Sequence, residues 1–132
     1  MTNYLLAPSI IASDFAHIAD EVAAIQSAGA DWIHVDVMDG HFAPDITIGP
    51  LFVRSLKRVA NLPLDVHLMI SEPEKYLLAF AQAGANNITV HVETCPNLLP
   101  VIEKIKSFGC KAGVTLNPAT PASAIDSALP FV

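Results

Sequence analysis

Short apolar stretches alternate along the chain with longer stretches in which hydrophobic residues recur every three or four positions. The apolar stretches cover about 5–9, 33–38, 64–69, 87–92 and 112–116. Their length is that of strands, whereas the segments between them have the period of amphipathic helices. Helices are predicted at 14–28, between 38 and 64, at 74–83, at 97–108 and from near Pro121. This alternation predicts a parallel sheet with right-handed crossovers.

Glycines mark the predicted helix ends. Gly29, Gly84 and Gly109 each separate a helical stretch from the apolar stretch that follows it. Glycine adopts the left-handed backbone conformation just past a helix end at little cost. No linker or low-complexity tract interrupts the repeated pattern. We therefore expect a single domain over residues 1–132.

Two architectures contain five units of this kind. One is an open doubly wound sheet, and the other is part of a (β/α)₈ TIM barrel. Dinucleotide-binding open sheets carry a glycine-rich turn after the first strand, but residues 7–12 read Ala-Pro-Ser-Ile-Ile-Ala. The pattern therefore favours an α/β fold of the barrel class, as an incomplete barrel of about five βα units.

Composition argues against several classes of function. Of the 132 residues, 52% are hydrophobic and 15% are charged, as in strands that are buried on both faces. No apolar run approaches the roughly 20 residues of a membrane-spanning helix, and the start Met1–Tyr4 lacks the basic residues of a signal peptide. A net charge of −6 argues against a nucleic-acid surface. We expect a cytoplasmic protein in which Cys95 and Cys110 are free thiols.

Polar residues interrupt two of the apolar stretches on one face only. They are His34, Asp36 and Met38 in the first of these and Asp65, His67 and Met69 in the second. Successive side chains of a strand point to opposite faces, so each set shares a face. Burying a histidine beside an aspartate is expensive unless the two are paired or bound to a metal ion. This face is therefore a candidate functional site.

Three of these residues form a candidate metal site. His34, Asp36 and His67 stand at similar positions on neighbouring strands, and imidazole and carboxylate ligands suit zinc, iron, manganese or cobalt. The alternative is that each histidine is a core residue hydrogen-bonded to a neighbour. His91 is interpreted as an outer or structural partner, and the role of Glu93 stays open. His17 and His41 are expected at the surface.

The segment 38–45 follows the second strand, at the rim where barrels of this class carry their chemistry. It contains Gly40 and Pro44. It fits either a mobile lid or a plain rigid turn.

Four long motifs resemble those of ribulose-phosphate 3-epimerases. They are LAPSIIASDF at 6–15, HVDVMDGHF at 34–42, DVHLM at 65–69 and GVTLNPATP at 113–121. The resemblance covers the whole chain, and the two middle motifs are the most specific. One departure is Asp45, where the family usually has asparagine.

The resemblance implies a TIM-barrel isomerase that interconverts D-ribulose 5-phosphate and D-xylulose 5-phosphate in the pentose phosphate pathway. A base removes the proton at C3, a 2,3-enediolate forms beside one divalent metal ion, and a second acid returns a proton on the opposite face. The resemblance implies that His34, Asp36 and His67 are the metal ligands and that Asp36 is also catalytic. It implies substrate contacts for Ser9, His67, Met38 and Met69. The implied partners are a small sugar phosphate and further copies of the chain.

The same resemblance places the second catalytic aspartate, a third methionine and the phosphate-binding loops beyond Val132. We therefore expect open barrel edges through which the chain self-associates. Two alternative functions follow. The chain is either a catalytically incomplete fragment of such an enzyme or a related ketose-phosphate (allulose 6-phosphate) 3-epimerase.

Overall fold

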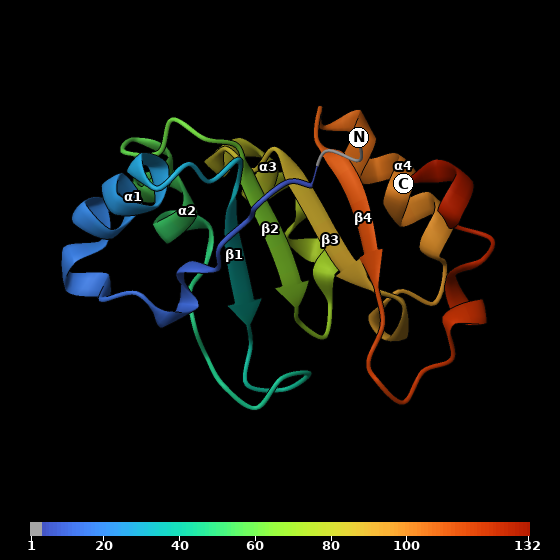
Figure 1. Ribbon diagram of the computed structural model, residues 1–132. Helices are drawn as coiled ribbons and strands as arrows, with labels where there is room; N and C mark the ends of the chain where they lie inside the picture. Colours follow the sequence, from blue (N-terminus) through green and yellow to red (C-terminus); the bar gives the residue numbers. More distant parts are fainter. Residues whose placement is uncertain (1–3) are drawn as a thin grey trace.

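Four parallel strands form one sheet in a computed structural model that describes residues 4–132 (Figure 1). The first three residues of the predicted domain, and with them most of the stretch considered as a signal peptide, lie outside the described part. The strands are β1 (Ile33–Met38), β2 (Leu64–Met69), β3 (Asn87–His91) and β4 (Lys111–Thr115). They lie side by side in chain order, β1-β2-β3-β4.

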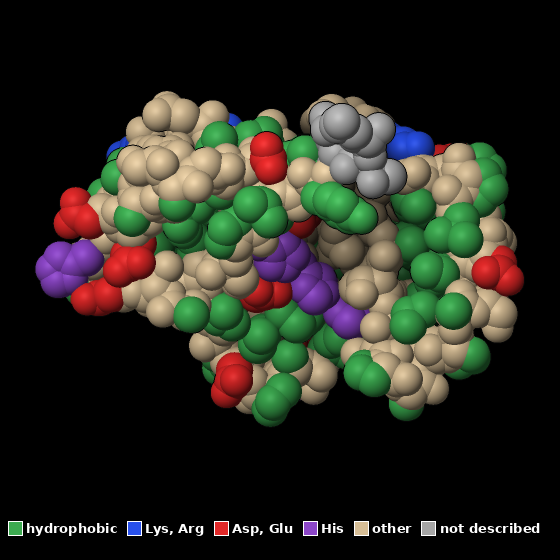
Figure 2. Space-filling model, viewed as in Figure 1, with side chains coloured by type: hydrophobic (Ala, Val, Ile, Leu, Met, Phe, Trp, Pro, Cys, Tyr) green, Lys and Arg blue, Asp and Glu red, His purple; other side chains and the backbone are tan. Residues whose placement is uncertain are grey.

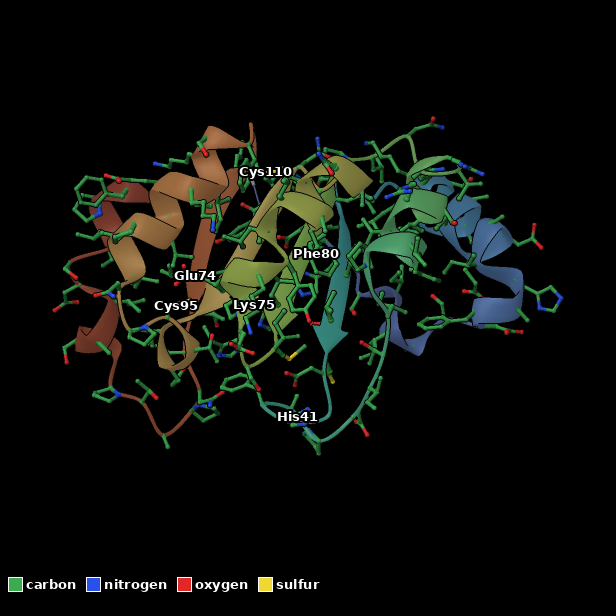
Figure 3. All side chains as sticks on the ribbon, turned by 180° about the vertical axis from the view of Figure 1, so that it is seen from behind. His41, Glu74, Lys75, Phe80, Cys95 and Cys110 are labelled. Atoms are coloured by element: carbon green, nitrogen blue, oxygen red, sulfur yellow. The ribbon has the colours of Figure 1, made fainter. Side chains whose placement is uncertain are left out.

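Helices cover one face of this sheet. They are α1 (Ile18–Ser27), α2 (Pro50–Lys57), α3 (Leu77–Ala83) and α4 (Leu98–Ser107). In Figure 1 the sheet is seen from its open side with α3 behind it, and Figure 3 shows the helical layer from its own side. Within the described residues, no helix is both long and apolar enough to cross a membrane.

The hydrophobic core lies between the sheet and the helices. Alternate residues of β1 and β2 are buried there, and Phe80 is the largest fully buried side chain. The apolar strand residues on this face are Ile33, Val35 and Val37 in β1 and Leu64, Val66 and Leu68 in β2. The opposite residues of both strands are only partly buried. The predicted division into an apolar and a polar face is therefore confirmed.

Strand order separates the two architectures that the sequence left open. A doubly wound sheet reverses its strand order and carries helices on both faces. The four described strands follow chain order, and α2 and α3 pack together on one side. This is the arrangement of consecutive βα units in a barrel wall. The fold is thus an α/β fold of the barrel class, present here as part of the barrel.

The predicted strand at 5–9 is not a strand of the sheet. The segment runs beside β1 with one isolated parallel bridge, between Ser9 and His34. The carbonyl oxygen of Pro8 accepts a hydrogen bond from the His34 N–H (2.9 Å). Continuing the ladder towards the start of the segment needs an N–H at position 8, which proline lacks. Within residues 4–132 the sheet therefore has four strands instead of the five predicted.

Helix boundaries also differ from the prediction. The helix expected at 14–28 begins as a separate 3₁₀ turn, Phe15–His17, which the Asp14 carboxylate caps by accepting from the Ala16 N–H (2.9 Å). The backbone of His17 (φ −123°, ψ 29°) then interrupts the helix before α1 begins. The helix expected near Pro121 is a 3₁₀ turn, Ala122–Ile125.

The prediction of free cysteines is confirmed. Cys95 and Cys110 are free and buried, and Figure 3 shows them well apart.

Candidate metal centre

The predicted site residues come together on the open face of the sheet. In the β1–β2 register, Asp36 stands opposite His67 and His34 stands opposite Asp65. The pairing of two parallel strands therefore places two histidines and two carboxylates within one patch. Figure 2 shows histidine side chains in a row across this face, with acidic side chains beside them.

Three ligand atoms converge in this patch. The Oδ1 atom of Asp36 lies 3.2 Å from His34 Nε2 and 3.0 Å from His67 Nδ1. One atom from each of the three residues lies within 4.8 Å of the others. Ligand atoms about 2.1 Å from a tetrahedral metal ion stand about 3.4 Å apart. The spacing and the nitrogen and oxygen donors therefore fit one transition-metal ion.

Strong pairing shifts the pKa values of two of these groups. Hydrogen bonds to the carboxylates of Asp36 and Asp65 raise the pKa of His34 to about 9, although burial opposes the shift. Hydrogen bonds from His34 and His67 hold the pKa of Asp36 well below its usual range, again against burial. A metal ion at this site would therefore compete with a proton for His34.

Ser9 holds the outer oxygen of Asp36. Its hydroxyl donates to Asp36 Oδ2 at 2.6 Å, and the parallel bridge between Ser9 and His34 carries it to this position. Asp36 thus has one oxygen in the ligand cluster and the other on a hydroxyl group. The predicted contact between Ser9 and a substrate stays a prediction.

Asp65 lies on the predicted polar face, but the sequence assigned it no role in the site. Its Oδ2 atom lies 2.8 Å from His34 Nδ1, behind the face that His34 turns towards the cluster. Its Oδ1 atom accepts a hydrogen bond from Asn87 Nδ2 at 2.6 Å. A carboxylate behind a ligand histidine fixes the ring orientation and the tautomer. The signal in the sequence was a carboxylate two residues before His67, on the same face of the same strand.

His91 touches the candidate site without joining the ligand cluster. Its ring meets that of His67 edge to edge, with centroids 5.0 Å apart, and is nearly buried. Its Nδ1 atom lies 3.3 Å from the Glu93 carboxylate. Burial and the nearby His67 lower the pKa of His91. The interpretation of His91 as an outer or structural partner agrees with this position.

The rim segment 38–45 is tied down as a turn. Asp39 accepts hydrogen bonds from the backbone N–H groups of His41 and Phe42 (both 2.9 Å) and of Ser71 (2.8 Å). Burial would raise the pKa of Asp39, but these donors hold it well below the usual range. These contacts favour the turn over the lid. His17 and His41 are exposed, as expected.

The two methionines stand side by side at the carboxyl ends of their strands, because Met38 pairs with Met69 in the register. Both are partly buried. A cavity of about 430 Å³ adjoins Met38, with Val37, Ile70 and Phe80 in its wall. Phe80 and Val37 belong to the core between sheet and helices. The cavity therefore lies on the helix side of the rim and is separate from the ligand cluster.

Fold and site together define a βα-barrel protein with a candidate metal centre on the inner face of its strands. Residues 5–132 match the model of the ribulose-phosphate 3 epimerase family, so the chain belongs to that family.

Curated relatives agree with this assignment. The chain is 55% identical over 121 residues to a ribulose-phosphate 3-epimerase of Bacillus subtilis, covering 92% of this chain and 56% of that protein. It is 52% identical over 130 residues to the enzyme of that name from Synechocystis, covering 97% and 56%. It is 51% identical over 133 residues to a chloroplastic ribulose-5-phosphate-3-epimerase of Arabidopsis thaliana, covering 99% and 47%. The chain thus spans about half the length of the curated relatives it matches.

Proposed function

We propose that this chain forms the metal-binding part of an isomerase that interconverts D-ribulose 5-phosphate and D-xylulose 5-phosphate. The convergence of His34 Nε2, Asp36 Oδ1 and His67 Nδ1, in a chain of this family, carries the proposal. These three residues would hold one zinc, iron, manganese or cobalt ion. When bound, the ion would act as a Lewis acid on the substrate oxygens at which negative charge develops.

Asp36 is the proposed base that takes the proton at C3. Its Oδ1 atom faces the other ligands, while within residues 4–132 Oδ2 is held by the Ser9 hydroxyl alone. A carboxylate fixed at one oxygen keeps the other in a defined place for proton transfer. Ser9 would orient this oxygen and also contact the substrate.

Met38 and Met69 are the proposed apolar wall of the reacting centre. They adjoin each other at the rim, two residue pairs beyond the Asp36–His67 pair and on the same face of the sheet. Their soft thioether side chains would keep water away from the carbanion-like intermediate without donating a proton to it.

Inversion at C3 needs a second acid on the opposite face of the substrate. The matched region covers 56% of the Bacillus subtilis and Synechocystis relatives, and the family resemblance places the second catalytic aspartate on a later strand. An alternative proposal therefore stands beside the first: this chain alone binds the metal ion but does not complete the epimerisation. A substrate of the hexulose type, such as allulose 6-phosphate, is the second alternative, because the matched motifs would scarcely differ.

Proton NMR of D-ribulose 5-phosphate in D₂O, with the chain and added zinc or iron, tests these proposals. Xylulose 5-phosphate carrying deuterium at C3 would establish the complete reaction. Deuterium at C3 without xylulose 5-phosphate would show that the chain exchanges the C3 proton on one face of the substrate, which is the step proposed for Asp36, but does not invert the configuration. A signal that persists in His34→Ala would contradict the metal site, while Glu103→Gln, an exposed change on α4, serves as the control.

We further propose a cytosolic location and self-association of the chain. Two free, buried cysteines suit a reducing compartment. Among the described strands, β4 has a partner on one side only, and an unpaired strand edge favours pairing with another chain.

A further inference from the structure

A chain of hydrogen bonds leads outward from the second face of the His67 ring. Nδ1 of His67 faces the ligand cluster, and its Nε2 atom lies 2.9 Å from Nε2 of His91. The other ring nitrogen of His91 lies 3.3 Å from Oε2 of Glu93. We call His67, His91 and Glu93 the relay.

The far end of the relay is anchored to the segment that follows β4. Oε1 of Glu93 accepts from the backbone N–H of Asn117 (2.6 Å) and from the hydroxyl of Thr120 (2.5 Å). Burial would raise the pKa of Glu93, but these donors lower it to about 2. At neutral pH this carboxylate can therefore only accept hydrogen bonds.

An accepting carboxylate at one end fixes every proton along the relay. The proton of the His91 ring must lie on Nδ1, where it meets Glu93. Nε2 of His91 is then an acceptor, so the proton of the His67 ring lies on its own Nε2. When an ion is bound, the lone pair of His67 Nδ1 is then directed at it, in place of the contact that Nδ1 makes with Asp36 Oδ1 in this structure (3.0 Å).

Packing holds the His91 ring in the orientation that the relay needs. The ring lies edge to edge with that of His67, with an angle of 20° between the rings, and Phe42 packs against it with a centroid distance of 4.7 Å. Only 5% of His91 is exposed. Turning the ring would break both of its hydrogen bonds inside the protein.

We propose that His91 and Glu93 are positioning residues of the metal centre, which set the tautomer of His67 so that its Nδ1 atom is ready to bind the ion. The inference rests on the proposed metal site. It also connects that site to the segment 117–120 at the rim.

The first test compares zinc affinities by titration calorimetry in wild type, Glu93→Gln and Glu103→Gln. A glutamine at 93 that keeps its oxygen on Asn117 and Thr120 turns its NH₂ group towards His91. That donor moves the His91 proton to Nε2, where it opposes the Nε2 proton of His67. We expect Glu93→Gln to bind zinc about 10–100-fold more weakly than wild type. Glu103→Gln removes an equal charge from an exposed site on α4 and should not change the affinity.

The second test separates hydrogen bonding from packing at position 91. Glutamine offers an acceptor and a donor at the end of its side chain, whereas leucine offers neither. We expect His91→Gln to keep most of the zinc affinity that His91→Leu loses. If the two variants stay folded and lose equal zinc affinity, the hydrogen bonds of His91 do not contribute to zinc binding, and the proposal fails.

The third measurement needs no variant. Long-range ¹H–¹⁵N spectra of the zinc-loaded wild type report which nitrogen of each ring carries the proton. We expect Nε2–H for His67 and Nδ1–H for His91, and a His91 proton on Nε2 would overturn the relay. Wild type that binds no zinc would overturn the metal site and the relay together. Zinc binding that is equal in wild type, Glu93→Gln and Glu103→Gln would overturn the relay alone.

Discussion

At the scale of single residues, Asp65 holds a side chain of the candidate site in place through two hydrogen bonds. It accepts from His34 Nδ1 on one oxygen (2.8 Å) and from Asn87 on the other (2.6 Å). An asparagine at 65 has one accepting oxygen and one NH₂ group, so it satisfies only one of these two donors. The His34 ring then loses its fixed orientation or Asn87 loses its partner.

We expect Asp65→Asn to lower the zinc affinity about 10–100-fold, measured by titration calorimetry. Asp126→Asn, an equal charge change at an exposed position, is the matched control. Equal affinities in the two variants would show that Asp65 does not act through His34.

At the scale of elements, the turn after β1 depends on one carboxylate. Asp39 accepts three backbone hydrogen bonds, one of them from Ser71 after β2. Its pKa is lower in the folded chain than in the unfolded chain. A group of this kind stabilises the fold above its unfolded pKa of about 3.9, and that contribution is lost as the pH falls towards the folded pKa.

We expect Asp39→Asn to lower the free energy of unfolding by about 1 kcal/mol at pH 7, a value reduced for solvent screening of this accessible carboxylate. The difference from wild type should shrink below about pH 4, because wild type then loses the same charge. Urea unfolding at pH 7 and pH 3 measures it. A difference that is as large at pH 3 as at pH 7 would rule out the charge as its cause.

The end of α3 lies against the Lys57 side chain of α2, at Gly84. Gly84 has a φ of +110°, and a Cβ there would lie 2.7 Å from Cγ of Lys57 on α2. Gly29 has a similar left-handed φ of +89° but nothing within 4 Å of its Cβ position. Both changes to alanine strain the backbone by about 1 kcal/mol. We expect Gly84→Ala to lower the free energy of unfolding by more than Gly29→Ala in urea titrations, and equal losses would show that Lys57 moves aside freely.

At the scale of the whole molecule, the proposed self-association depends on the edge of the sheet. The open face and the β4 edge leave strand groups available to a second copy of the chain. Sedimentation velocity should show dimers or larger species at micromolar concentration. Thr115→Lys, a charge on the open side of the edge strand, should shift the distribution towards monomer. Ser107→Lys adds the same charge on α4 and should not, and a compact monomeric wild type would contradict the prediction.

The sequence by itself determined the kinds of elements and the two faces of the strands. Strand residues alternate strictly, so the apolar set Ile33, Val35 and Val37 implied a polar set opposite it, and burial confirms both. The motifs around His34 and His67 were long enough to indicate the family, which the family match confirms. Pro8 also carries its own information, since its missing N–H ends the ladder beside β1 and leaves the segment 5–9 outside the sheet.

Only the tertiary structure decided which atoms of those residues meet. The register of β1 and β2 places Asp65 behind His34 and Asp36 between the two histidines. Side-chain rotation then directs one nitrogen of His67 to the cluster and the other to His91. A sequence gives the spacing of residues along one strand. The contacts between strands arise from pairing and packing, so the roles of Asp65 and Glu93, and the atoms through which His91 meets His67, are defined only once the strands are side by side.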